Sequence, residues 1–369
     1  MRYLSVCGGA STSGAGYISD VTSTHEFRPG FEFDVEALTE YLRVVVPNFV
    51  GPIRVRQFPG GQSNPTYRLD TPAGDFVLRR KPPGVLIPSA HAVEREYRVM
   101  HALATHTEVP VPRPVVSCED PTVIGTAFFV MQHLDGRILW DPALPELPLA
   151  RRRPLYDAMI AGLAALHAVD YVAIGLTDFG RPEGYVARQV SRWSKQYAND
   201  SAEAGRVADM EKLIDWLPKK APVGEPAAAI VHGDYRIDNL IFDHASTRLL
   251  GILDWELSTI GNPIADFAYH LMAYRIASGG VRGLAGIDLV AQGLPREAEY
   301  VAAYCAHRGI DHVPDLEYYL VFCMFRLAAI CHGIRGRVER GTAVSPEAKK
   351  YAAQVEPLAQ LALGTALRS

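Results

Sequence analysis

The sequence has few cysteines and no large excess of charge of either sign, and both scarcities exclude classes of protein. Its five cysteines are scattered and none forms a Cys-x-x-Cys pair, which argues against a zinc site and fits a reducing cytoplasm. The net charge is -4. Because affinity for a nucleic-acid backbone depends on clustered Lys and Arg, we expect no nucleic-acid partner, and the short run 151–153 of three arginines does not change this expectation.

Long hydrophobic runs are also scarce. Residues 1–16 are rich in Gly and Ser and lack the apolar core of a secretory signal, so we expect residues 1–33 to be a poorly ordered extension of a cytoplasmic protein. The one membrane-like stretch, 318–334, contains Arg326 and the triplet Cys331-His332-Gly333. We therefore expect a core helix there and no membrane contact. With 369 residues, of which 48% are hydrophobic, the chain is long enough for two lobes.

Two polar motifs border short apolar segments in the second half of the chain. The first, His232-Gly233-Asp234-Tyr235-Arg236-Ile237-Asp238-Asn239, separates the apolar runs 227–231 and 240–242. The second, Leu253-Asp254-Trp255-Glu256, ends the apolar run 249–253. The apolar runs predict short buried strands. If these strands are neighbours, the polar residues between and after them converge at one end of a small sheet.

The residue types in these motifs suit phosphoryl transfer, which needs a base for the acceptor hydroxyl and oxygen ligands for Mg²⁺. We predict that Asp234 is the base and that Asn239 and Asp254 bind the metal, with Glu256 assisting directly or through water. Taken singly, an Asp or Asn beside a strand is more often a turn residue. The joint pattern favours the phosphotransfer interpretation. His232 is expected to fix the loop by bonding to the backbone or to Asp266.

The chain resembles the aminoglycoside phosphotransferase family, in which a His-Gly-Asp motif is followed by Asn and a metal-binding Asp follows on the next strand. It is most similar to the kinase-like domains that occur alone in bacteria or fused ahead of acyl-CoA dehydrogenases. That narrower resemblance rests on four segments, 76–84, Arg188-Gln189 with Arg192-Trp193, 261–266 and 326–330. The family usually has Asp where this chain has Asn262, a difference at an expected turn.

The resemblance implies an α+β, bilobal, protein-kinase-like fold. Its N-lobe, over 34–134, would be an antiparallel sheet with one helix and would bind the nucleotide. Its larger, mainly helical C-lobe, over 135–369, would hold the catalytic and acceptor-binding residues. The sequence agrees in outline, because strand patterns predominate from 51 to 134 and helical patterns lie near 154–168, 182–199 and 203–217.

The first half contains residues expected to bind the phosphates of the nucleotide. Strands at 53–58 and 66–69 are joined by a segment that includes Gly60, Gly61, Gln62, Ser63 and Asn64, and such a loop can close over phosphates. The next strand leads to Arg79, and a helix beginning near 91 carries Glu96. The resemblance implies that Arg79, aligned with the usual lysine, pairs with Glu96 against the α- and β-phosphates. Lys81 is the competing candidate, and a solvated basic patch over 79–81 is the alternative.

A buried strand over 127–131 should lead into the hinge. By resemblance, the backbone of Gln132 and Leu134 would bind adenine, and Met131 would lie behind the ring. Met131 could equally be ordinary core. Backbone recognition leaves no side-chain signature, so ATP is expected and GTP is not excluded.

The acceptor wall is expected to include Arg188, Arg192, Trp193, Tyr269 and Arg326. Arg188 and Arg192 share a helix face and could hold an anionic acceptor such as a coenzyme A thioester, or they could be a surface pair packed over the tryptophan. Residues 184–198 contain no acid, which argues against a polycationic drug. We therefore expect an ATP- and Mg²⁺-dependent kinase of a small-molecule hydroxyl, with a hydroxyacyl-CoA as the favoured acceptor. The alternatives are an antibiotic phosphotransferase and, because Arg79 replaces the usual lysine, a regulatory nucleotide-binding module without turnover.

Overall fold

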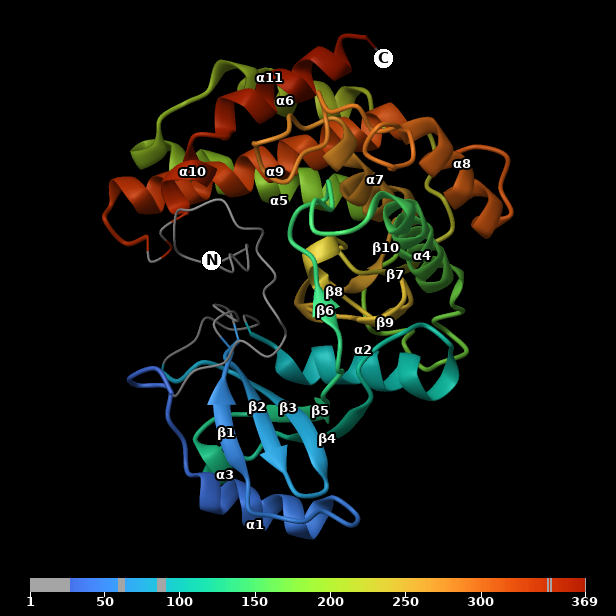
Figure 1. Ribbon diagram of the computed structural model, residues 1–369. Coiled ribbons are helices and arrows are strands. Elements are labelled where there is room, and N and C mark those ends of the chain that lie inside the picture. Colours follow the sequence, from blue (N-terminus) through green and yellow to red (C-terminus); the bar gives the residue numbers. More distant parts are fainter. Residues whose placement is uncertain (1–26, 59–63, 85–90, 344, 346, 369) are drawn as a thin grey trace. The chain divides into compact units, whose positions relative to one another are not determined.

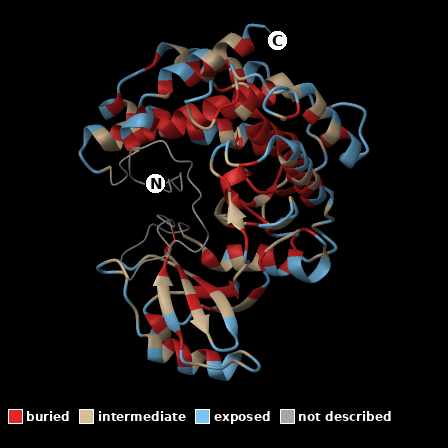
Figure 2. Cartoon of the chain, in the orientation of Figure 1, coloured by how far each residue is buried: buried red, intermediate tan, exposed pale blue. Residues whose placement is uncertain are grey.

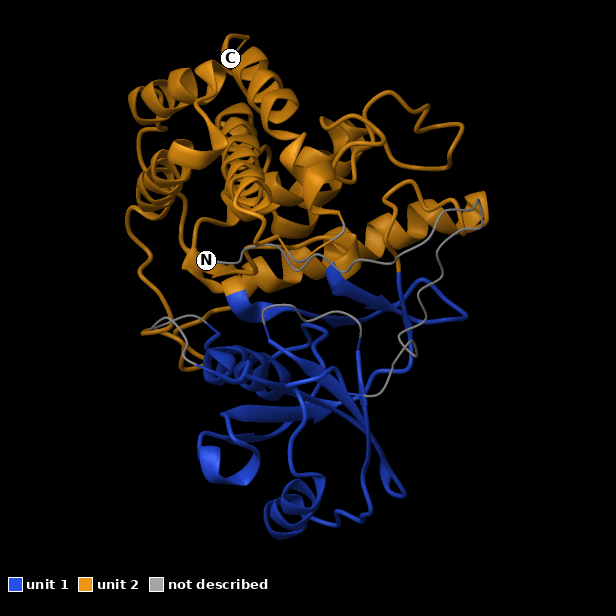
Figure 3. Cartoon of the chain, turned by 90° about the vertical axis from the view of Figure 1, so that its left-hand side faces the viewer, with its two compact units in different colours: residues 1–11, 18–138, 239–256 blue, residues 12–17, 139–238, 257–369 orange. Residues whose placement is uncertain are grey.

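The computed structural model describes residues 27–58, 64–84, 91–343, 345 and 347–368, and these form two compact units (Figure 3). Within the described chain, unit 1 comprises 27–138 and 239–256, and unit 2 comprises 139–238 and 257–368. The assignment of 239–256 differs from the expected division at 134/135. The reason is strand pairing, because 239–256 contains a hairpin that pairs with residues 137–138 of unit 1.

Unit 1 is built on a five-stranded antiparallel sheet in the order β1-β2-β3-β5-β4 (Figure 1). Its strands are β1 (Arg54–Gln57), β2 (Thr66–Thr71), β3 (Gly74–Arg80), β4 (Pro114–Cys118) and β5 (Phe128–Gln132). Its helices are α1 (Val35–Val45), α2 (Val93–His106) and α3 (Pro121–Ile124). The expected helix is α2, and α1 and α3 are two more, begun by side-chain caps from Asp34 and Asp120.

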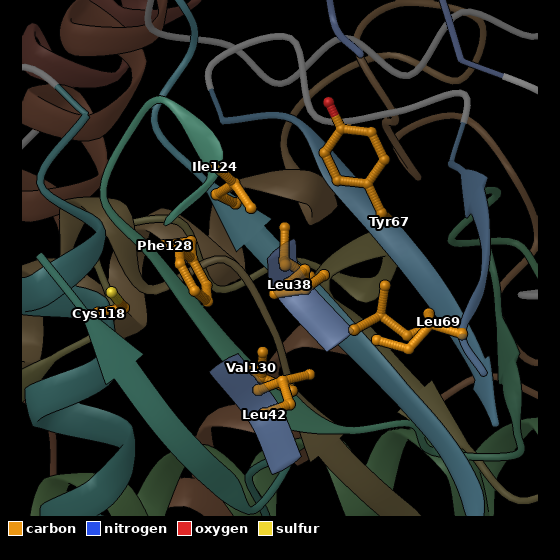
Figure 4. Packing of buried hydrophobic residues seen from close by; sticks show 10 residues of the cluster. Leu38, Leu42, Tyr67, Leu69, Cys118, Ile124, Phe128 and Val130 are labelled. Carbon is orange, nitrogen blue, oxygen red and sulfur yellow. The ribbon is translucent and has the colours of Figure 1, made fainter. Parts of the chain in front are cut away.

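The core of unit 1 lies between α1 and one face of the sheet. Leu38 and Leu42 of α1 pack against alternate residues of the strands, among them Tyr67, Leu69 and Phe128 (Figure 4). Residues 27–33, expected in the poorly ordered extension, contribute to this core, because the rings of Phe27 and Phe33 lie 5.7 and 5.1 Å from that of Tyr67. Residues 1–26 lie outside the described part.

The other face of the sheet carries α2 (Figure 1). Strand alternation sends neighbouring arginines of β3 to opposite faces. The buried Arg80 lies over the Phe33 ring and bonds to Thr126, on the α1 face. Arg79 points to α2, which determines the partners available to it.

The strands of the two motifs do not all pair as neighbours. β7 (Ala229–Val231) pairs with β10 (Thr259–Gly261) in unit 2. β8 (Leu240–Phe242) pairs with β9 (Leu249–Ile252) and β6 (Arg137–Ile138) in unit 1. The expected convergence at one sheet end therefore holds for the residues that border β8 and β9, whereas the residues after β7 belong to another sheet.

Unit 2 is mainly helical. Its longer helices are α4 (Leu149–Ala168), α5 (Tyr185–Ala204), α6 (Ala208–Lys219), α7 (Pro263–Leu271), α8 (Glu297–Arg308), α9 (Leu316–Glu339) and α11 (Val355–Ala366). The short ones are α10 (Ala348–Ala352) and the 3₁₀ turn η3 (Met272–Tyr274). Two further 3₁₀ turns, η1 (Ile237–Asn239) and η2 (Trp255–Leu257), each cross a border between unit 1 and unit 2.

Helix α9 is the core helix of unit 2, as the sequence predicted. It packs against α5, α7, α10 and α11 and is buried along most of its length (Figure 2). Among the described residues, α9 is the one helix whose length and hydropathy would suit a membrane span, and 94% of that apolar window is buried in the protein. The interior of unit 2 thus accounts for its hydrophobicity.

Candidate active site

The predicted metal ligands Asn239 and Asp254 lie at the same end of the β8–β9 hairpin. The antiparallel register pairs Leu240 with Ile252, and the Leu253 N–H donates to the Asn239 carbonyl at 2.8 Å. Asp254 has a φ of 64°, in the left-handed region that Asp tolerates better than most side chains. This backbone ends the strand and redirects the chain at the proposed metal ligand.

Arg79 is the centre of a buried cluster of charges in unit 1. Its guanidinium lies 2.9 Å from Glu96, 2.7 Å from Asp254 and 3.6 Å from Glu256, so one cation is shared by three carboxylates. The excess of carboxylates and the burial affect the pKa of Glu96. Burial most strongly, and Asp254 with it, raise the pKa of Glu96 to about 7, although Arg79 acts in the opposite direction. Burial alone would lower the pKa of Arg79, and the three carboxylates raise it.

The structure separates the two candidate phosphate-binding cations. Arg79 forms the predicted ion pair with Glu96, whereas Lys81 lies 2.9 Å from Glu94. A further contact comes from the loop between β1 and β2, where the buried Asn64 donates to Glu96 at 2.9 Å. The other predicted residues of that loop, Gly60, Gly61, Gln62 and Ser63, lie outside the described residues.

The oxygen donors of unit 1 fit a magnesium ion in kind. Asn239, Asp254 and Glu256 supply one amide and two carboxylates, the hard ligands that Mg²⁺ prefers, and the contacts of both carboxylates with Arg79 show that they already face a cation. In the described chain, no group of three or more His, Cys, Asp or Glu residues is placed to hold a metal by itself. Mg²⁺ in phosphotransfer sites typically uses one or two carboxylates and completes its shell with water and phosphate oxygens.

The predicted hinge follows β5. Met131 is buried, and the Gln132 N–H donates to the Arg113 carbonyl at 2.8 Å. An adenine contact at Gln132 would therefore have to use the carbonyl. Leu134 packs against Gly251 of β9, where even a Cβ atom would come within 2.4 Å of the leucine side chain.

In unit 2, the loop after β7 is fixed by Asp266 of α7. Its carboxylate accepts the backbone N–H groups of His232 at 2.7 Å and Gly233 at 2.8 Å, and it lies 3.2 Å from His167 Nε2. The predicted bond between His232 and Asp266 thus uses the His232 backbone, while the His232 ring accepts from the Asp234 N–H at 3.2 Å. Burial is the largest influence on Asp266, yet these donors hold its pKa below the usual value.

The structure explains the residue type at two positions near this loop, one a glycine and the other a helix cap. Gly233 has a φ of 81°, and a Cβ there would lie 2.7 Å from the Leu257 carbonyl, so only glycine fits. Asn262 caps α7 by accepting the N–H groups of Ile264 and Ala265. Asn and Asp are comparable at such a cap, which accounts for the departure from the family pattern.

Asp234 is buried, and two side chains contact Oδ1 of its carboxylate. Oδ1 accepts the Tyr269 hydroxyl at 2.8 Å and lies 3.0 Å from Nε of Arg236. Arg236 and Asp238, two and four residues further on, share an ion pair, and Arg282 is a second cation on Asp238. Sequence reasoning missed Arg236, Asp238 and Arg282. The first two lie within the motif, whereas Arg282 comes from a distant loop and carried no local signal.

The residues predicted as an acceptor wall do not form one surface. Trp193, Tyr269 and Arg326 are only 4, 3 and 7% exposed and lie together beneath the Asp234 loop. Arg188 is half-buried and bonds to the carbonyls of Glu183 and Arg181. Arg192 is exposed and lies over the Trp193 ring, 5.5 Å from its centre, which is the packing that the alternative interpretation described.

A hollow with an empty volume of about 610 Å³, its solvent-open part included, adjoins this loop in unit 2. Two of its lining residues, Arg236 and Tyr269, contact Asp234. Its wall is largely apolar, and its charged members are Arg236, Asp238 and Arg282. The Tyr274 hydroxyl and one Asp238 oxygen, both lining residues, are buried without a hydrogen-bond partner in the structure.

His270 also lines the hollow. Its burial predicts that the free energy of unfolding depends on pH. Its Nδ1 lies 3.2 Å from the Tyr235 carbonyl and its Nε2 2.8 Å from the Tyr300 hydroxyl. Burial lowers its pKa from 6.5 to about 4. Between these two pH values the unfolded chain binds the proton more strongly than the folded protein does. The free energy of unfolding should therefore decrease as the pH is lowered from about 6.5 to 4, by about 3 kcal/mol at most.

Chemical denaturation at pH 7.5 and 5 tests this dependence. His270→Gln can keep both hydrogen bonds but does not titrate, so its stability should change less between the two pH values than that of the wild type. Equal slopes for the two proteins would show that His270 is not the group responsible.

The fold is that of a kinase-like phosphotransferase. The model of the phosphotransferase enzyme family, APH, matches residues 54–314. The chain belongs to this family and is a phosphotransferase enzyme, which confirms the resemblance and the fold class inferred from the sequence.

Similar proteins of known structure include a Ralstonia eutropha protein named "putative aminoglycoside phosphotransferase", with 46% identity, a TM-score of 0.84 and coverage of 91% of this chain and 99% of that one. A spectinomycin phosphotransferase in complex with ADP and spectinomycin, 14% identical, has a TM-score of 0.59 over 90% of this chain and 98% of that one, and shares the fold.

Curated relatives include acyl-CoA dehydrogenase family member 10 of Mus musculus, 41% identical over 93% of this chain and 32% of that protein. Another is the probable acyl-CoA dehydrogenase IBR3 of Arabidopsis thaliana, 40% identical over 90% of this chain and 42% of that protein. The chain thus spans a third to less than half of the length of these two relatives.

Proposed function

We propose that this phosphotransferase transfers the γ-phosphoryl group of ATP, with Mg²⁺, to a hydroxyl of a small anionic metabolite, with a hydroxyacyl-CoA as the favoured acceptor. Unit 1 supplies the nucleotide half. Arg79, held by Glu96, would bind the α- and β-phosphates, and Asn239 and Asp254, assisted by Glu256, would hold Mg²⁺. The backbone of Gln132 and Leu134 would bind the adenine. When bound, the ion would neutralise charge on the phosphates.

Unit 2 supplies the base. In the proposed reaction the acceptor oxygen forms a bond to the γ-phosphorus, the bond from that phosphorus to the ADP oxygen breaks, and the acceptor proton passes to Asp234. Oδ1 of Asp234 is held by Tyr269 and Arg236, so the carboxylate is orientated before the acceptor binds.

The observation that carries the choice of acceptor is the lining of the hollow beside Asp234. It has a long apolar wall, two arginines and one aspartate. A polycationic aminoglycoside would need an excess of carboxylates, whereas an acyl chain suits the apolar wall and anionic groups suit the arginines. The names of the curated relatives, acyl-CoA dehydrogenases, agree with an acyl-CoA as the acceptor class.

Two observations favour other functions. The Ralstonia eutropha protein carries the name of an aminoglycoside phosphotransferase, which supports an antibiotic as acceptor. Arg79 in the place of the usual lysine supports a regulatory module without turnover. A panel with labelled ATP and Mg²⁺ separates the three, with hydroxyacyl-CoAs of different chain length, kanamycin, spectinomycin and no acceptor. We expect phosphorylation of hydroxyacyl-CoAs, and transfer to an aminoglycoside alone, or ATP binding with no transfer at all, would contradict the proposal.

Filling the hollow should impair acceptor binding specifically. Ala273→Phe places a ring in the hollow, and we expect the acceptor KM to rise at least about tenfold while the ATP KM stays within about twofold. Ala306→Phe on the exposed side of α8 is the matched control. Unchanged acceptor kinetics in a folded Ala273→Phe protein would place the acceptor elsewhere.

A further inference from the structure

The Asp234 loop rests on two buried polar side chains from different helices of unit 2. Tyr269 of α7 donates its hydroxyl to Asp234 Oδ1 at 2.8 Å. Arg326 of α9 donates from Nη2 to the carbonyl of Gly233, the preceding residue, at 2.8 Å. One contact therefore fixes the carboxylate and the other fixes the backbone that carries it.

These two side chains also stabilise each other. The Arg326 guanidinium carbon lies 4.7 Å from the centre of the Tyr269 ring and 5.8 Å from that of Trp193 on α5. A cation over aromatic faces in a buried site is attracted to both rings. Burial, and next the Asp234 carboxylate, raise the pKa of Tyr269 well above its usual value, so its hydroxyl stays a donor at all physiological pH values.

We propose that Tyr269 and Arg326 are positioning residues that hold the catalytic carboxylate, and that their polar groups do not bind the acceptor. Both are more than nine-tenths buried, and each donates a hydrogen bond to the Asp234 loop, from the Tyr269 hydroxyl and from Arg326 Nη2. The stack of Trp193, Arg326 and Tyr269 joins α5, α9 and α7, so the orientation of the base is set by the core of unit 2. This inference rests on the proposed role of Asp234 as the base.

The hydrogen bond from Tyr269 has a predictable effect on the base. A donor to a carboxylate stabilises its ionised form and restricts its rotation. Without the donor, the carboxylate should take up its proton at higher pH and should spend less time in the productive orientation. Both effects reduce turnover without removing a polar contact to ATP or to the acceptor, because the Tyr269 hydroxyl is directed at Asp234.

Tyr269→Phe removes the donor with the smallest change of shape. We expect kcat to fall roughly tenfold, with both KM values within about twofold, and the acidic limb of the kcat–pH profile to move to higher pH. Selective ¹³C labelling of aspartate, with the Asp234 resonance assigned by its loss in Asp234→Asn, should show the same direction of change in its NMR titration. Tyr318→Phe is the control, because that buried hydroxyl donates to the Leu217 carbonyl and not to the loop.

Arg326→Lys and Arg326→Met form the second test. Lysine keeps a cation over the rings and one donor, so it should retain more of kcat than methionine does, again with unchanged KM values. Arg335→Lys is the control on the same helix, since Arg335 bonds to Ala352 and Glu356 instead.

A rise in the acceptor KM with kcat unchanged would make Tyr269 an acceptor contact and overturn the inference. An Asp234 titration and a kcat that are the same in Tyr269→Phe as in Tyr318→Phe would overturn it as well. The NMR titration needs no turnover, so it decides the matter even if no acceptor is phosphorylated. Full activity of Asp234→Asn would instead contradict the proposed function, whereas an inactive Asp234→Asn beside a fully active Tyr269→Phe would contradict only this inference.

Discussion

Asp234→Asn should lower kcat by on the order of a hundredfold or more and leave the affinity for ATP nearly unchanged. The amide can still accept the Tyr269 hydroxyl through its oxygen, so the loop should keep its shape, but it cannot take up the acceptor proton. Steady-state kinetics with the best acceptor, together with titration of a fluorescent ATP analogue, measure the two quantities separately.

The matched control for this variant is Asp243→Asn, the same chemical change in the turn between β8 and β9. Asp243 accepts the N–H groups of Ala245 and Ser246, a role that Asn also fills. Its kinetics should be those of the wild type. Loss of ATP affinity in Asp234→Asn as large as the loss of turnover would show that Asp234 acts in nucleotide binding.

Asp254→Asn should abolish phosphoryl transfer at every Mg²⁺ concentration and leave the protein folded. The variant removes one negative charge from the proposed metal ligands, and a neutral amide binds Mg²⁺ more weakly than a carboxylate does. Asn also tolerates the left-handed backbone conformation found at residue 254. Because three carboxylates share Arg79, removing one charge relieves repulsion, so the thermal unfolding midpoint should be unchanged or raised.

A titration of activity with Mg²⁺ and a thermal unfolding curve test both halves of that expectation. Asp75→Asn is the control, since Asp75 is also paired with an arginine of unit 1, Arg68, away from the Arg79 cluster. Activity that recovers at high Mg²⁺ would mean that Asp254 contributes to affinity for the ion but is not required as a ligand.

The sequence was sufficient to predict those features that depend on residues close together along the chain. The resemblance aligned Arg79 with the usual lysine, alternation along β3 places Arg79 and Arg80 on opposite faces, and the pairing of Arg79 with Glu96 is present. The convergence of Asn239 and Asp254 followed from one hairpin. Such features depend on a few consecutive residues, so strand periodicity and turn residues can specify them.

Features that depend on distant contacts could not be predicted. Local pattern does not show that β7 pairs with β10 while β8 pairs with β6, and the division expected at 134/135 therefore placed 239–256 in the C-lobe, whereas these residues group with unit 1. Arg326 was expected in the acceptor wall, yet its partners, Gly233 and Tyr269, are more than fifty residues away along the chain. Pairing of this kind is decided by tertiary packing.

Because residues 239–256 fold with the first unit, the described part of the polypeptide passes between the units three times, after residues 138, 238 and 256. Neither unit is a continuous piece of the gene, and a fragment that stops at residue 138 would leave β6 without the strand that it pairs with. Producing one unit alone would require a permuted chain in which the hairpin is spliced directly behind residue 138, and the splice would fall at Asn239, one of the residues assigned here to the metal.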